Sequence, residues 1–298
     1  MTHRKQKKYR WGGSWTEEKL NAFSKYVGAY LTIMNKHRNK YRWQLIYFDG
    51  FAGSGSREED HCSDTIDMFE EFGISVDDTT IYKGAAERVL SIEQEGFDFY
   101  YFIDKNEESS NALEQKLTPF RAEGKKLEFR CDDANSQLAK LAEALKDKKY
   151  KALVLLDPFG MQVNWDSISA LAGTGTDLWI LIPTGVVINR LLDKKGQLTH
   201  IDKLTDFLGM TKEEIEAAFY ERTVMPTLFG DIEEVHKKQQ PIEKIAQLYI
   251  QRLNTIFTNV TSEPLVMRNS KNNPIYHFAF ASNNSTAVSI ASDIIGSI

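Results

Sequence analysis

The hydrophobic pattern along the chain alternates between two periods. Short continuous apolar runs recur, and segments with apolar residues three or four positions apart lie between them. The first run, Leu45-Ile46-Tyr47-Phe48, shows no polar alternation, so it predicts a strand that is buried on both faces of a sheet. Four similar runs lie further along the chain, at 97–103, 127–131, 152–156 and 178–182, and these four recur about every 25 to 29 residues.

The segments between these runs have the spacing of amphipathic helices. The first is predicted over residues 16–37, with Ser14 and Glu17 as a capping box and Phe23, Val27 and Leu31 on its apolar side. Strands and helices that alternate in this way favour right-handed βαβ units and a mostly parallel sheet. Further helices are predicted over 85–92, after an Asn135 cap, after Asn164, from Pro241 onward, and over 286–295.

Two regions interrupt the alternation. Residues 57–83 are irregular and acidic, and we interpret them as an insertion over a ligand site, either a lid or a surface loop. Residues 185–238 are predicted to be a helical insertion without strands, with Thr211 and Glu214 as a second capping box. Near the end, runs at 264–268 and 275–281 flank a turn-forming linker and predict an antiparallel hairpin.

The first strand runs into a glycine loop, Asp49-Gly50-Phe51-Ala52-Gly53-Ser54-Gly55. Glycines let the backbone turn sharply and let a ligand approach the peptide N–H groups. A plain turn would have the same composition. The spacing differs from the GxGxxG of dinucleotide enzymes, and no Lys-Ser or Lys-Thr follows, so the sequence excludes a P-loop.

Acidic residues end the next strands. Asp104 stands where a carboxylate accepts hydrogen bonds from ribose hydroxyls, and Asp132 or Asp133 where one can accept from an adenine amino group. Each is equally explained as a helix cap or turn residue. A cofactor without phosphates fits best, and S-adenosyl-L-methionine is one, with Asp49 placed to attract its ammonium group.

The fourth strand ends in Asp157-Pro158-Phe159-Gly160. Methyl transfer from a sulfonium to nitrogen is an in-line displacement, so the protein mainly has to align the acceptor. Asp157 and the Pro158 carbonyl could accept hydrogen bonds from an exocyclic amine, and Phe159 could stack on a flipped or single-stranded base. The alternative is a structural turn that is filled by a core phenylalanine.

Composition narrows the class of protein. With 42% hydrophobic and 27% charged residues, the 298-residue chain has the composition of a soluble globular protein, and no apolar run reaches the ~20 residues of a membrane span. The basic start lacks a secretory signal, so we expect a cytoplasmic protein. Two distant cysteines and six histidines without ligand spacing predict neither a disulfide framework nor a metal site.

Charge is distributed unevenly. Residues 1–42 hold 11 Lys and Arg against 2 Asp and Glu, whereas the rest holds 26 against 40. A basic arm interleaved with Tyr9, Trp11, Trp15 and Trp43 could follow a phosphate backbone and stack on bases. A solvated tail that leads into a helix explains the same composition.

These stretches together resemble the class I S-adenosylmethionine-dependent methyltransferases, and more closely the bacterial three-Cys-motif partner (TcmP) family. The motifs that carry the resemblance are Trp15-Thr16-Glu17-Glu18-Lys19-Leu20, Tyr47 to Gly55, Tyr101-Phe102-Ile103-Asp104, Leu156-Asp157-Pro158-Phe159-Gly160, Pro274-Ile275-Tyr276 and Phe280-Ala281-Ser282-Asn283. The tetrad at 157–160 is similar to one in tRNA guanine N2-methyltransferases. It departs from the Asp/Asn-Pro-Pro-Tyr/Phe form of adenine and cytosine methyltransferases, which argues against adenine as the acceptor.

The resemblance implies an α/β, Rossmann-like fold with a mostly parallel seven-stranded sheet and one antiparallel strand, to which the pattern at 185–238 adds the helical insertion. We expect one domain over residues 1–298, with the basic arm and first helix in 1–42. The resemblance also implies a companion protein that bears a three-cysteine motif. The expected cofactor-binding residues are Asp49, Gly50, Phe51, Gly53, Gly55, Asp104, Lys105, Asp132 and Asp133, and the expected catalytic residues are Asp157, Pro158 and Phe159.

Three hypotheses about function follow. The first is a methyltransferase that acts on a nitrogen of a nucleic-acid base. The second is a binding protein with a residual cofactor pocket that docks the three-cysteine protein. The third, a nicotinamide-dependent oxidoreductase, is disfavoured by the glycine spacing.

Deletion of residues 1–12 is expected to weaken binding to nucleic acid and to flatten its salt dependence, because fewer cations would contact phosphates. Binding titrations at several salt concentrations measure both effects. An unchanged salt slope would point to a small-molecule or protein substrate.

Overall fold

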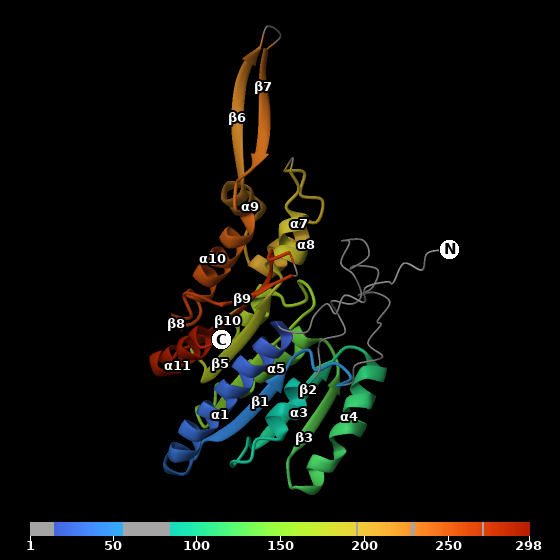
Figure 1. The fold of residues 1–298 in the computed structure, drawn as a ribbon, viewed down its shortest axis with the longest axis vertical. Helices are drawn as coiled ribbons and strands as arrows, with labels where there is room; N and C mark the ends of the chain where they lie inside the picture. The colour runs from blue at the N-terminus through green and yellow to red at the C-terminus, as the bar shows by residue number, and fades with distance from the viewer. Residues whose placement is uncertain (1–14, 56–83, 195, 228–229, 270) are drawn as a thin grey trace, which may run out of the picture.

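The computed structural model describes residues 15–55, 84–194, 196–227, 230–269 and 271–298 (Figure 1). The predicted cap at Ser14, the arm that precedes it, and the inserted loop at 57–83 lie outside the described residues.

Five parallel strands form the centre of the main sheet, in the order β3-β2-β1-β4-β5. The prediction of a mostly parallel α/β sheet is confirmed. The chain builds outward on one side of β1 and then returns to build on the other, so the strand order reverses between β1 and β4. The bounds are β1 (Gln44–Asp49), β2 (Phe99–Asp104), β3 (Leu127–Cys131), β4 (Tyr150–Leu156) and β5 (Thr176–Ile182).

One antiparallel strand extends this sheet. β10 (Pro274–Ser282) pairs with β5, and its outer edge pairs with both β9 (Leu265–Arg268) and β8 (Asn259–Val260). The predicted C-terminal hairpin, β9 with β10, is confirmed. β8 was not predicted, because a two-residue strand is too short to produce a periodic pattern. The sheet has eight strands, one more than predicted, and it is seven strands wide because β8 and β9 share one edge.

Helices cover both faces of the sheet (Figure 1). α1 packs against α3 and α11, while α5 packs against α6. Within the described part of the chain, no helix combines the length and apolarity needed to cross a lipid bilayer. The helices are α1 (Trp15–Tyr41), α3 (Ala85–Leu90), α4 (Glu107–Ala122), α5 (Ala134–Ala144), α6 (Trp165–Ser169), the π-helix η2 (Thr184–Ile188), α7 (Asn189–Leu191), α8 (Ile201–Leu208), α9 (Lys212–Phe219), α10 (Pro241–Leu253) and α11 (Ser285–Gly296).

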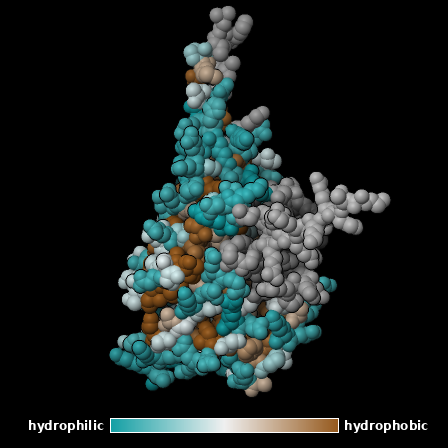
Figure 2. Space-filling view, in the orientation of Figure 1, coloured by the Kyte–Doolittle hydropathy of each residue, from teal (hydrophilic) through white to brown (hydrophobic). Residues whose placement is uncertain are grey.

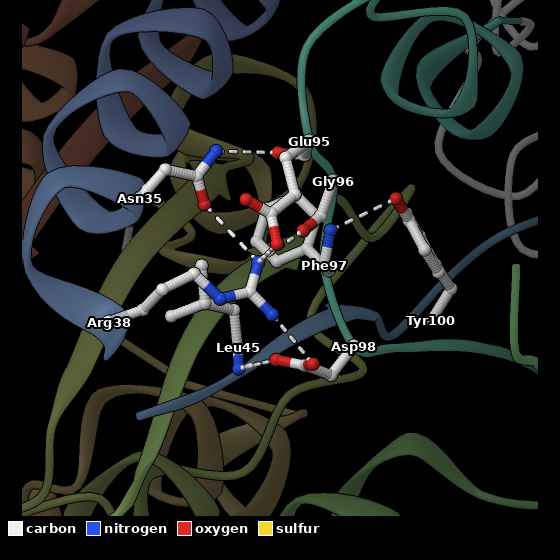
Figure 3. A network of polar contacts seen from close by, with 8 residues as sticks. All are labelled: Asn35, Arg38, Leu45, Glu95, Gly96, Phe97, Asp98 and Tyr100. Atoms are coloured by element: carbon white, nitrogen blue, oxygen red, sulfur yellow. Dashed lines mark hydrogen bonds and ion pairs between the residues drawn. The ribbon is translucent and has the colours of Figure 1, made fainter. Parts of the chain in front are cut away.

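The last turns of α1 are tied to the loop that precedes β2 (Figure 3). The Arg38 guanidinium donates to Asp98 Oδ1 at 2.6 Å and to the Gly96 carbonyl at 3.1 Å. Asp98 Oδ2 in turn accepts from the Leu45 N–H at 2.6 Å, and Asn35 donates to the Glu95 carbonyl at 2.7 Å. One network therefore fixes where α1 ends, where β1 begins and how the next strand enters.

The prediction that residues 185–238 contain no strands is wrong. Helices α8 and α9 are present, and the Thr211–Glu214 capping box is confirmed, but β6 (Tyr220–Thr227) and β7 (Gly230–Lys237) form an antiparallel hairpin. The hairpin projects from the body of the molecule (Figure 1) and is mostly hydrophilic along its length (Figure 2). Residues 221–226 are all exposed, so neither face is buried and the period-two pattern of a strand does not arise.

Replacing Arg38 by Met is expected to lower the free energy of unfolding by about 2 kcal/mol, because Asp98 would lose its partner in a mostly buried position. Urea unfolding measures the loss. Arg121→Met is the matched control, since the ion pair of Arg121 with Glu114 is exposed and should contribute less than about 1 kcal/mol. Equal losses in the two variants would contradict this account.

Candidate active site

Three carboxylates meet at the carboxyl edge of the sheet. Asp49 ends β1, Asp104 ends β2, and Asp157 directly follows β4. In the register of the sheet Asp49 lies beside Phe102 on one side and Leu155 on the other, so the acidic residues of both neighbours follow two positions later. Parallel pairing thus brings together residues that are 108 positions apart at most, at the point where the strand order reverses.

The glycine loop crosses this edge. The Gly50 N–H donates to the Leu155 carbonyl at 3.0 Å, and the Ala52 N–H donates to the Ile103 carbonyl at 2.9 Å. Gly53 and Gly55 have φ values of 60° and 66°, in the left-handed region that side chains disfavour. A Cβ at Gly50 would lie 2.7 Å from the Leu156 side chain. The loop therefore needs each glycine for its conformation or for close packing on β4.

Asp104 is held by this loop. Its Oδ2 accepts from the Gly53 N–H at 2.9 Å, and its Oδ1 accepts from the Asn106 N–H at 2.8 Å. Because both bonds are to backbone, the half-buried carboxylate has a fixed orientation at the tip of β2. Hydroxyls of a bound sugar could be recognised by such a carboxylate.

A buried ion pair joins α1 to the end of β4. Lys19 Nζ lies 2.5 Å from Asp157 Oδ2, and the two side chains are only 2% and 1% exposed. Burial lowers the pKa of Lys19, and the carboxylate of Asp157 opposes that change. Burial raises the pKa of Asp157 to about 6, against the effect of the neighbouring ammonium.

Asp49 is a second buried acid beside this pair. Burial and the charge of Asp157 raise the pKa of Asp49 to about 7, while hydrogen bonds from the Phe51 N–H and the Tyr47 hydroxyl, both at 3.2 Å, lower it. Two buried acids therefore lie near a single ammonium, that of Lys19. A cation bound near Asp49 would favour its ionised form.

One buried oxygen in the site accepts no hydrogen bond from the described residues, and it is Asp157 Oδ1. Leaving a buried acceptor unsatisfied costs roughly 1–3 kcal/mol, so a ligand that donates a hydrogen bond here gains correspondingly.

These residues line a hollow at the tips of β1 and β4. Of the predicted site residues, Asp49, Phe51, Gly55 and Asp157 lie on its wall, and the remaining wall comes from Lys19, Leu20, Ala52, Leu113, Lys116, Leu117 and residues 84–87. Lys116 holds one side together, because it donates to the Gly55 carbonyl and lies 2.8 Å from Glu87. Asp104 lies at the neighbouring strand tip, outside this wall.

Asp132 and Asp133 are engaged in the start of α5. Asp133 is the N-cap and accepts from the N–H groups of Asn135 and Ser136, so the predicted cap at Asn135 is wrong. The N-cap lies two residues earlier than predicted. The side-chain amide of Asn135 instead donates to the Gln162 carbonyl at 2.8 Å. Asp132 accepts from Gln137 at 2.5 Å, which with other bonds lowers its pKa. Lys105 is exposed beside them.

The backbone of the tetrad 157–160, which follows β4, is held by a tyrosine of β10. Pro158 is buried, Phe159 is half-buried against the core, and the Phe159 carbonyl accepts from the Tyr276 hydroxyl of β10 at 3.3 Å. The two interpretations of this turn are compatible, because a ring that is packed on one side still has an exposed part.

Sequence reasoning did not identify Lys19, Tyr47 or Tyr276 as site residues. The pattern carried a signal for Lys19, which stands four and seven positions before Phe23 and Tyr26 on the apolar side of the first helix. A lysine in that position must be buried with a partner. No comparable signal marks Tyr276, whose contact depends on the pairing of β10.

No protein-family model and no curated protein matches this sequence. Protein LPL1258 from Legionella pneumophila, of the family DUF519, is 15% identical at a TM-score of 0.41, with 92% of this chain and 99% of that chain covered. The Escherichia coli protein yhhF, a candidate methyltransferase, is 12% identical at a TM-score of 0.25, with coverage of 70% and 85%. An rRNA methylase from Streptococcus thermophilus is 12% identical at 0.24, with coverage of 70% and 96%. At these values the likenesses carry no argument about chemistry.

Asp49→Asn is expected to change how stability depends on pH. Asp49 keeps its proton up to about pH 7 in the folded state but loses it near its ordinary pKa of 3.8 when unfolded. The folded state thus binds more protons between these values, and the free energy of unfolding falls as pH rises through that window. Relative to the variant, the wild type should lose on the order of 2–4 kcal/mol, measured by urea unfolding at several pH values. Parallel pH profiles would contradict the buried acid.

Proposed function

We propose that this protein is an S-adenosyl-L-methionine-dependent methyltransferase that acts on a nitrogen of a nucleic-acid base. The observation that carries the proposal is the set of three carboxylates, Asp49, Asp104 and Asp157, at the ends of adjacent parallel strands beneath a glycine loop. The buried Asp49 suits the ammonium group of such a cofactor, and the orphan oxygen Oδ1 of Asp157 suits an acceptor amine that donates a hydrogen bond.

The chemistry of the donors supports this cofactor over a dinucleotide. The cofactor has a sugar for Asp104 and a cationic amino-acid end for Asp49, and it supplies an activated methyl group on a sulfonium. It has no phosphate, and the loop has no lysine followed by serine or threonine to hold one. The loop also lacks the GxGxxG spacing of dinucleotide enzymes, so the oxidoreductase hypothesis is disfavoured.

The acceptor side is the proposed role of Asp157, Pro158 and Phe159. Lys19 holds Asp157 Oδ2, which leaves Oδ1 to accept from an acceptor amine and direct its lone pair. The Pro158 carbonyl would accept from the same amine, and the Phe159 ring would stack on the base. Tyr276 fixes the backbone of this turn, so the chain aligns the acceptor and needs no strong base.

A second candidate function is docking of a companion protein, and the β6–β7 hairpin favours it. Residues 221–226 of the hairpin are all exposed, and they include Val224 and Met225 at 59% and 42% exposure. Its acidic residues, Glu221, Asp231, Glu233 and Glu234, outnumber Arg222 and Lys237. That balance suits a basic protein surface better than nucleic acid.

Two substitutions separate cofactor binding from methyl transfer. Asp104→Asn should weaken binding of S-adenosyl-L-methionine at least about tenfold in calorimetry, because a hydrogen bond to a charged group is lost. Asp157→Asn should retain the cofactor affinity but lower methyl transfer to bulk RNA or DNA about 100-fold, because the acceptor is misaligned.

Asp206→Asn, on the exposed side of α8, is the control and should alter neither measurement. The absence of cofactor binding at millimolar concentration would refute the proposal. Binding without transfer to any acceptor in the wild type would favour the docking function, and displacement by NAD would favour the oxidoreductase.

A further inference from the structure

A basic and aromatic cluster lies at the opposite, amino-terminal edge of the sheet. We call it the basic–aromatic patch and define it as Lys40, Tyr41, Arg42, Trp43, Lys148 and Lys151. The first four residues come from the end of α1 and the turn into β1, which lie at the lower edge of Figure 1. The two others come from the turn before β4 and the strand itself.

The sheet register assembles the patch from two distant segments. Gln44 pairs with Tyr150 and Leu45 with Lys151, so Trp43 precedes β1 directly beside the start of β4. The Trp43 N–H donates to the Arg38 carbonyl at 2.9 Å, which closes the end of α1. Arg42 occupies the left-handed region there, with a φ of 54°.

Two stacked rings form the centre of the patch. The ring centroids of Tyr41 and Trp43 are 4.8 Å apart with an interplanar angle of 22°. Lys40 Nζ lies 5.1 Å from the centroid of Tyr41, and Lys151 Nζ lies 5.4 Å from that of Trp43. Tyr41 is 50% exposed, so part of its ring is available to a further aromatic group.

Positive charge is concentrated here in a protein of net charge −5. Residues 36–43 hold four Lys and Arg and no Asp or Glu, and residues 146–151 hold four Lys and one Asp. The nearby acids already have partners, since Asp147 pairs with Lys149 and Asp98 with Arg38. Among the described residues, the patch cations Lys40, Arg42, Lys148 and Lys151 form no ion pair with a carboxylate.

We propose that the basic–aromatic patch binds a single-stranded nucleic acid, with phosphates on its cations and a base stacked on Tyr41. Cations alone would fit any polyanion, but an exposed ring flanked by cations is the chemistry that recognises a phosphate backbone and an unstacked base together. A duplex keeps its base faces covered, so it would use the cations alone.

The patch is distinct from the candidate active site. β1 runs from the patch to Asp49, and at ~3.3 Å per residue the six steps from Trp43 to Asp49 place the two about 20 Å apart. A strand bound at the patch is therefore anchored away from the carboxylates, and the proposal does not depend on methyl transfer.

The test is fluorescence anisotropy of the full chain, without cofactor, using labelled oligouridylate and oligodeoxythymidylate of about 16 nucleotides. Lys40→Gln/Arg42→Asn should weaken binding and reduce the slope of log K against log salt by about 1.4, because two phosphate contacts are lost. Asn is used at position 42 because it tolerates the left-handed region. Tyr41→Ala should weaken binding about tenfold and leave the salt slope unchanged.

Lys203→Gln/Lys271→Gln is the matched control, since both lysines are exposed and lie outside the patch. It should change neither affinity nor slope, and thermal melts establish that all variants are folded. Inorganic polyphosphate, which has no bases, should bind Tyr41→Ala as well as it binds the wild type.

Three outcomes would overturn the proposal. They are no binding of either oligonucleotide at low salt, equal losses in the patch and control variants, and a loss of polyphosphate binding in Tyr41→Ala equal to that for the oligonucleotides. A preference for the RNA or the DNA probe would identify which nucleic acid is bound.

Discussion

The buried ion pair between Lys19 and Asp157 is the interaction on which the site depends. It joins the first turns of α1 to the end of β4, across 138 positions of the chain, with both side chains almost fully enclosed. Such a pair adds little net stability compared with apolar packing, but loss of either partner leaves a buried charge uncompensated. It therefore specifies where α1 must lie on the sheet, and the hollow between α1, the glycine loop and α4 follows from that position.

Around this pair, one buried acid and one buried oxygen lack a full set of partners among the described residues. Asp49 and Asp157 are buried close to each other with the ammonium of Lys19, and Asp157 Oδ1 accepts no hydrogen bond from the described residues. The fold compensates for these costs elsewhere, through the apolar core around β1 and β4 and through the network of Arg38. A site of this kind gains most from a cation near Asp49 and a hydrogen-bond donor at Asp157, which the proposed cofactor and its acceptor would supply.

The two ends of the parallel strands differ chemically in this protein. The carboxyl edge gathers acidic residues because Asp49, Asp104 and Asp157 each end a strand or directly follow one. The amino edge gathers Trp43 and Lys151 because the neighbouring strands β1 and β4 begin there. The acidic and basic groups are thus separated by the length of a strand. An anionic polymer can therefore be attracted to the basic, amino edge without being held at the acidic, carboxyl edge.

The sequence by itself determined the five parallel strands of the main sheet, since strands buried on both faces leave uninterrupted apolar runs. It also determined the glycine loop and the acidic residues at the ends of β1, β2 and β4, because those are local in the chain. Only the tertiary structure decided what pairs across the chain: Lys19 with Asp157, Tyr276 with Phe159, and Tyr41 with Trp43 beside Lys151. It also decided the β6–β7 hairpin, where residues 221–226 are exposed on both faces and leave no alternating pattern in the sequence. Periodicity records which side of a segment is buried, whereas these contacts depend on which segments become neighbours.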